Sequence, residues 1–138
     1  MSPEFTTGLF TLAGVLLGAV IAYRFTLQLH MRLAKQAAGA RLRSVTFEIL
    51  ARTHPQTKIG GTRLDLVMRE HFHEQHAAAF GFQHFLPSTE RERFGEAWNA
   101  YTGTKEGQHG ADFQQYDGFD GYKLLEQRLR ALLSFTDS

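Results

Sequence analysis

The sequence predicts a mainly α-helical protein, with one N-terminal transmembrane helix followed by a small helical cytoplasmic domain. Three observations lead to this fold class. Residues 5–23 contain no charged side chain, basic residues follow this run closely, and apolar residues beyond residue 60 recur at helical spacing. The length of 138 residues allows one anchor and one small domain.

The composition narrows the class of protein. Hydrophobic residues make up 43% and charged residues 21% of the chain, which is not a disordered composition, and the 12 Phe indicate a packed core. A formal net charge of +1 gives no general attraction to nucleic acid. The absence of Cys excludes disulfides, thiolate metal sites and thiol catalysis.

The apolar run has the length of a membrane span. A helix over residues 5–23 would extend roughly 28 Å, close to the thickness of a bilayer's hydrocarbon core. Glu4 precedes the run and Arg24 follows it. Its hydroxyl side chains can donate to backbone carbonyls one turn back, which suits Thr6, Thr7 and Thr11 to lipid.

The apolar run has two other interpretations. A buried core helix would need to be covered on all sides, which a domain of this size can hardly do. A cleaved signal peptide would end near Val20 and Ala22, but the start of the chain has no Lys or Arg. The transmembrane interpretation is therefore favoured.

The charge distribution predicts the orientation. The basic residues just beyond the run are Arg24, Arg32, Lys35, Arg41 and Arg43. The positive-inside rule then places the N-terminus outside and the C-terminal domain in the cytoplasm, so the chain is expected to cross the membrane once.

Small residues lie along one face of the predicted span. Gly14 and Gly18 form a G-x-x-x-G pair, and Ala22 extends it by one turn. Such residues let two helix backbones approach closely, so we expect a homo-oligomer within membrane lipid. The alternative is that these residues are incidental, because Gly and Ala are common in spanning helices.

We expect two parts, residues 1–40 as the anchor with a cytoplasmic extension and residues 41–138 as the soluble domain. The first helix should end near Gly39. Residues 41–54 fit a helix or a strand, with helix favoured, and residues 55–62 form a loop because of Pro55 and the paired glycines.

The sequence predicts that the soluble domain is a helical hairpin plus a C-terminal helix. The hairpin's first helix begins at a Thr62 cap and runs to Leu86, before Pro87. Ser88 caps the second helix and Gly103 ends it. A long loop covers residues 103–118, and the last helix covers about residues 119–135. The expected buried positions are Leu64, Met68, Phe72, Ala79, Phe82, Leu86, Phe94, Ala97, Trp98, Tyr101, Tyr122, Leu125, Leu129, Leu132 and Leu133.

One histidine-rich stretch could hold a metal. Glu70, His73 and His76 have the spacing of ligands on one helix face. However, only one Glu-x-x-His is present and the H-E-x-x-H motif is absent, so a solvated polar face with one His turned toward the core is the favoured interpretation. No nucleophile elbow or phosphate loop occurs, and we expect no catalytic residue and no cofactor.

The aromatic residues of the predicted hairpin have two interpretations. Phe94, Trp98 and Tyr101 are expected to form its core, with Phe80, Phe82 and Phe85 across the turn. The alternative is an exposed aromatic groove that binds a partner helix.

Three stretches carry a resemblance to a known group. They are Phe72-x3-His76-x3-Phe80, then Phe94-x2-Ala97-Trp98-x2-Tyr101, then Leu124-Leu125-x3-Leu129-x2-Leu132-Leu133. Together they resemble a loose group of small, uncharacterised bacterial single-pass membrane-anchored helical proteins. The resemblance implies a bacterial inner membrane and a helical cytoplasmic domain, and implies no activity.

The sequence therefore favours a membrane-tethered module for protein interaction and oligomerisation, without catalysis. A protein partner is possible besides a second copy. Two alternatives stay open: a membrane-perturbing oligomeric effector, holin-like or defence-associated, and an anchored metalloenzyme that uses Glu70, His73 and His76.

Overall fold

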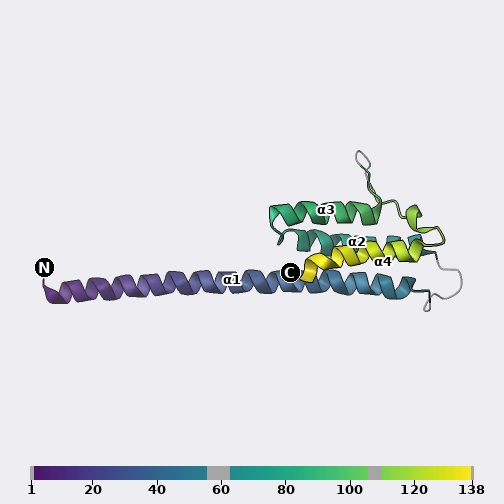
Figure 1. Ribbon diagram of the computed structural model, residues 1–138. Helices are drawn as coiled ribbons and strands as arrows, with labels where there is room; N and C mark the ends of the chain where they lie inside the picture. The colour runs from purple at the N-terminus through teal and green to yellow at the C-terminus, as the bar shows by residue number, and fades with distance from the viewer. Residues whose placement is uncertain (1, 56–62, 106–109, 138) are drawn as a thin grey trace. The chain divides into compact units, whose positions relative to one another are not determined.

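The computed structural model describes residues 2–55, 63–105 and 110–137, and these residues form two compact units, Met1–Lys35 and Gln36–Ser138. All regular elements among them are helical: α1 (Pro3–Thr53), α2 (Leu64–Gln83), α3 (Ser88–Thr102), the 3₁₀ turn η1 (Gln114–Tyr116), α4 (Gly121–Ser134) and the 3₁₀ turn η2 (Phe135–Asp137). The expected all-α class with a long apolar N-terminal helix is confirmed (Figure 1).

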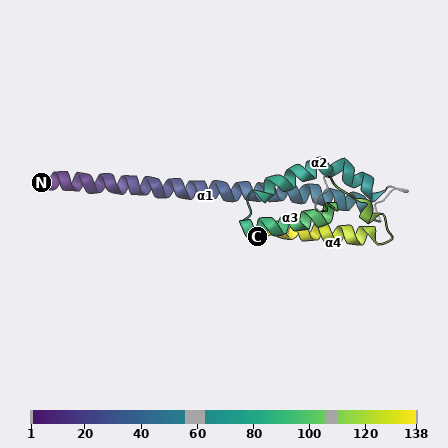
Figure 2. The same ribbon diagram turned by 90° about the horizontal axis from the view of Figure 1, so that it is seen from above.

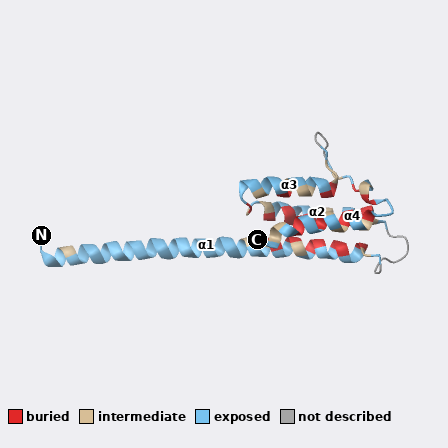
Figure 3. Ribbon diagram, in the orientation of Figure 1, coloured by how far each residue is buried: buried red, intermediate tan, exposed pale blue. Residues whose placement is uncertain are grey.

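The first unit is a single helical segment whose side chains are almost all exposed. Its most apolar window has a mean hydropathy of 2.0, is long enough to cross a membrane, and is 0% buried within the chain. Figure 3 shows nearly all of this segment in the colour of exposed residues. The alternative of a core helix is therefore wrong for the chain by itself.

The second unit is an antiparallel bundle made by the C-terminal part of α1 together with α2, α3 and α4 (Figure 2). The buried side chains of α1 recur three and four residues apart, so they fall on one stripe that faces the bundle. Each of the other helices also buries apolar side chains. The largest buried apolar side chains of the four helices are Leu42, Ile49, Met68, Phe82, Phe94, Tyr101, Leu125, Leu129 and Leu132.

The helical interpretation of residues 41–54 is confirmed, because α1 continues to Thr53. The expected helix end near Gly39 is wrong. Gly39 is buried in the middle of α1, and a Cβ there would be 3.4 Å from Cε2 of Phe82. A glycine inside a helix costs about 1 kcal/mol relative to Ala. The Phe82 ring packs against the α1 backbone at this position.

The helix boundaries of the hairpin differ in detail from the expectation. Thr62 lies outside the described residues, and the residue before α2 is Arg63, whose side chain makes no capping hydrogen bond. Ser88 is the first residue of α3 rather than its cap, which is Pro87. Gly103 does end α3, with a φ of 71° in the left-handed region. A side chain there would collide with the backbone, because a Cβ would be 2.3 Å from the carbonyl oxygen of Asp112.

The segment expected as a loop over residues 103–118 contributes to the core. Phe113 and Tyr116 are 1% exposed and pack beside Tyr101, with ring centroids 5.7 and 6.4 Å from it. The backbone N–H of Asp112 donates to the carbonyl of Thr102, the last residue of α3, so the segment lies against the end of that helix. The described part of this segment is therefore a packed connection that covers the end of α3.

Candidate functional site

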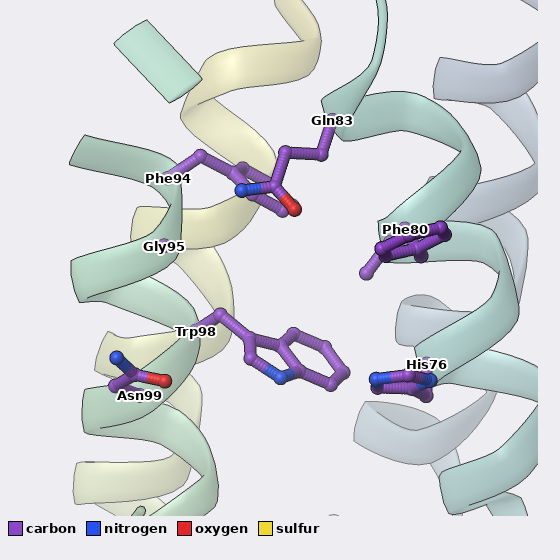
Figure 4. A pocket seen from close by; sticks show the side chains of 8 residues that line it. His76, Phe80, Gln83, Phe94, Gly95, Trp98 and Asn99 are labelled. Carbon is purple, nitrogen blue, oxygen red and sulfur yellow. The ribbon is translucent and has the colours of Figure 1, made fainter. Parts of the chain in front are cut away.

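A pocket of about 170 Å³ opens between α2 and α3, and we call it the α2–α3 pocket. Its lining combines aromatic rings, small residues and two amides: His76, Ala79, Phe80, Gln83, Phe94, Gly95, Trp98 and Asn99. In Figure 4, His76 and Phe80 from α2 lie opposite Trp98 and Phe94 from α3. A mixed lining of rings and a few polar groups is typical of a binding pocket.

The α2 wall of the pocket is part of a ladder of rings. Phe72, His76, Phe80 and His84 are spaced by four residues, so they share one helix face. Successive ring centroids are 5.7, 6.3 and 4.9 Å apart. Phe80 is 57% exposed, which leaves its ring available to a binding partner.

The three aromatic residues expected as the hairpin core divide between core and pocket. Phe94 and Tyr101 are 1% and 0% exposed and belong to the core. Trp98 is only half-buried, and its ring lies 5.8 Å from that of His76 and 6.2 Å from that of Phe72. Trp98 therefore forms the inner wall of the α2–α3 pocket. Both interpretations of the aromatic residues hold in part, each for different side chains.

The turn from α2 to α3 is fixed by polar contacts at one end of the pocket. The guanidinium of Arg91 donates to the carbonyl of Leu86 at 3.2 Å and approaches that of His84 at 3.5 Å. The side-chain amide of Gln83 donates to the carbonyl of Arg91 at 3.4 Å. These contacts hold the two walls of the pocket at a set separation.

A series of hydrogen bonds between buried polar groups lies beside the aromatic core. Tyr101 donates from its hydroxyl to Oε1 of Gln75 at 2.6 Å, and the Gln75 amide points to the hydroxyl of Thr46 on α1 at 3.5 Å. Tyr116 donates to the backbone carbonyl of Tyr101. Three helices and η1 are thereby tied together through groups that water does not reach. Burial raises the pKa of Tyr101, and also that of Tyr116 to about 12.

Glu70, His73 and His76 do not converge on a common point. Glu70 faces Arg52 at 3.9 Å, His73 is exposed beside Phe72, and His76 stacks with Phe80 in the pocket wall. Among the described residues, no group of three or more His, Asp or Glu side chains could hold a metal ion. The three side chains lie on one helix, but each has a different neighbour.

A different histidine is the one that turns toward the core. His71 is 7% exposed, its Nδ1 is 2.9 Å from the carbonyl of Val67, and its Nε2 is 3.7 Å from a carboxylate oxygen of Glu48 on α1. Glu48 also pairs with Arg52 at 3.2 Å. The position follows from periodicity, since His71 lies between Met68 and Gln75 on the buried stripe of α2.

The small residues of the first unit are exposed. A Cβ added at Gly14 or Gly18 would meet no atom within 4 Å, and Ala22 is exposed. The hydroxyls of Thr7 and Thr11 donate to carbonyls four residues back at 2.9 Å, as the sequence predicts. Thr6 makes the same contact at 3.5 Å.

Comparison with known proteins gives no match: no family model, no curated protein and no solved structure corresponds to this chain.

Proposed function

We propose that the protein is a membrane-tethered interaction module, with residues 5–23 crossing a bacterial inner membrane once and the second unit binding protein in the cytoplasm. One observation carries this proposal. The apolar window of α1 is 0% buried, so the chain itself covers none of this apolar surface. Lipid is the solvent that can cover such a helix on every side.

The backbone and hydroxyl groups of this segment support insertion. A helix satisfies its backbone donors internally, and Thr7 and Thr11 bond to its own carbonyls. The lipid would therefore meet no unpaired donor from these side chains. The basic residues that begin at Arg24 supply the asymmetry that keeps the following unit on the cytoplasmic side.

The α2–α3 pocket supports binding rather than catalysis. Among the described residues that line it, His76 is the one titratable group, and none offers a carboxylate, hydroxyl or thiol that could act with it as a nucleophile or second acid–base group. Rings beside amides, in contrast, suit a side chain inserted by a protein partner. Gly14, Gly18 and Ala22 would add a helix-packing face that brings copies together within the membrane.

The test uses the full chain with a C-terminal tag, expressed in bacteria. We expect it to stay in the membrane pellet after an alkaline wash. The tag should resist protease in intact spheroplasts and be cut after lysis. Leu16→Arg places a charge in the middle of the span at a cost of about 3 kcal/mol, so it should shift the chain toward the soluble fraction. Leu66→Arg is the matched control, because Leu66 is 54% exposed on α2.

Two outcomes would overturn the proposal. Wild-type chain in the supernatant would remove the anchor, and a tag digested in intact spheroplasts would reverse the orientation.

A membrane-perturbing effector predicts in addition that expression dissipates the membrane potential. The hydroxyl groups of the span bond to its own backbone, which leaves few polar groups to line an aqueous pore.

A further inference from the structure

We propose that Phe119 of one copy inserts into the α2–α3 pocket of a neighbouring copy, so that the second unit is its own binding partner. This inference rests on the proposed function, because the shared membrane brings the copies together. It goes further by naming the partner and the contact.

Phe119 is an unusual residue for a surface. Its exposed fraction is 105%, so its ring does not pack on its own chain. It lies in the short connection between η1 and α4, next to Gly118. A phenyl ring held in water gains from any apolar surface that covers it.

The α2–α3 pocket offers such a surface. Its volume of about 170 Å³ is of the order of one large side chain, and its walls include Phe80 and Trp98, which a third ring can contact edge to face. Gly95 adds no side chain to the pocket, and there is room beside it, since a Cβ there would meet only Nε2 of Gln83, at 3.8 Å.

The polar groups of the two surfaces can pair as hydrogen-bond acceptors and donors. Asp117 and Asp120 flank Phe119, and both are exposed. The pocket presents an imidazole at His76 and amides at Gln83 and Asn99, and none of the lining residues that the structure describes is a carboxylate. These groups can donate hydrogen bonds to the carboxylates and to exposed carbonyls of the connection.

The contact joins two different patches of the second unit. The pocket is formed by α2 and the middle of α3, whereas Phe119 lies in the connection that precedes α4. Helix α4 begins at the end of the bundle where α3 finishes (Figure 1). Two copies can exchange this contact reciprocally in a closed pair, or each copy can pass it on to the next in a ring or open chain. One inserted ring gives a small interface, which becomes significant when copies share a membrane plane.

The experiment places full-length protein in liposomes and measures energy transfer between copies that carry a donor or an acceptor at the C-terminus. Phe119→Ala removes the inserted ring, and Gly95→Trp fills the pocket. We expect each variant alone to associate about tenfold or more weakly than wild type. Leu66→Ala and Gly81→Trp are the matched controls. They change an exposed apolar side chain and an open helical glycine outside the pocket, and they should leave association unchanged.

Mixing the two variants is the decisive arm. Phe119→Ala keeps an open pocket and Gly95→Trp keeps its Phe119, so donor-labelled Phe119→Ala and acceptor-labelled Gly95→Trp should pair with each other. A second pocket variant, His76→Glu, sets a carboxylate against Asp117 and Asp120 and should also weaken association. His73→Glu makes the same change outside the pocket lining, and should have no effect.

Unchanged association of Phe119→Ala would overturn the inference, and so would failure of the mixed variants to pair while both retain wild-type helicity. If Gly95→Trp does not fold, the comparison of His76→Glu with His73→Glu decides. Flotation of the liposomes reports the anchor separately: protein that does not float refutes the proposed function, and the same mixing in solution at high concentration then tests the contact itself.

Discussion

The hydroxyl of Tyr101 on α3 donates a 2.6 Å hydrogen bond to Oε1 of Gln75 on α2, and both side chains are 0% exposed. The same Gln75 faces Thr46 on α1, so one amide links three helices inside the bundle. A buried polar group without a partner is costly, which makes this arrangement select one packing of the helices.

Removal of this hydroxyl should destabilise the bundle. Tyr101→Phe leaves Oε1 of Gln75 buried without its donor, at a cost of about 1–3 kcal/mol in the free energy of unfolding. Chemical denaturation of the full chain in detergent, followed by circular dichroism, measures the change. Tyr122→Phe is the control, because Tyr122 is only half-buried, and its effect should be clearly smaller. Equal effects of the two changes would contradict a role for the Gln75 contact.

Alkaline pH should weaken the bundle within a defined window. Burial raises the pKa of Tyr116 from the ordinary 10.0 to about 12, and burial raises that of Tyr101 as well. Above pH 10 the unfolded chain releases these protons while the folded chain keeps them. The free energy of unfolding therefore falls as pH rises from 10 toward 12, and this contribution is complete below 10. Denaturation at stepped pH, with tyrosinate absorbance as the titration readout, tests the sign. A rise in stability across this window would contradict it.

Any side chain at Gly103 should destabilise the fold. Gly103→Ala holds a Cβ in the left-handed region against the carbonyl of Asp112, which we expect to cost about 1–3 kcal/mol of stability. Gly81→Ala makes the same chemical change in open space on α2, and should stabilise by about 0.5–1 kcal/mol. Thermal unfolding of the two variants beside wild type gives both signs, and a stabilised Gly103→Ala would refute the argument.

The proposed helix-packing face of the anchor can be tested apart from the pocket. Gly14→Ile and Gly18→Ile add bulk where the chain itself has open space, so they should leave the fold intact. We expect association in a membrane two-hybrid assay to fall about tenfold. Ala13→Ile adds bulk at a position about 100° around the helix from Gly14, and should have little effect. Unchanged association of the glycine variants would remove this face.

The spacing of the histidines predicts the helix on which they lie, but not the residues that they contact. Periodicity placed His73 and His76 on α2, and it allowed one histidine to turn inward, which is His71. It could not show that His76 stacks against Phe80 and faces Trp98, because that depends on how α2 and α3 pack. A pocket between two helices is a property of their packing, and no local pattern encodes it.

At Gly39 and Tyr116 the local sequence also predicts a structure different from the one observed. A glycine after a run of alanines normally indicates a helix end, but the ring of Phe82 packs against Gly39 and the helix continues. Tyr116 follows a polar, glycine-containing stretch that indicates a loop, yet it is buried because it completes the core beside Tyr101. Contacts between distant segments outweighed the local preference in both places.

The sequence by itself determined the helical class and the apolar, charge-free character of residues 5–23, because both depend on the order of residues along one helix. Only the tertiary structure decided that Trp98 lines a pocket, that Gln75 joins three helices and that Phe119 lies fully exposed. The physical reason is that burial and hydrogen bonding between helices depend on which faces meet, and the faces meet only when the chain has folded.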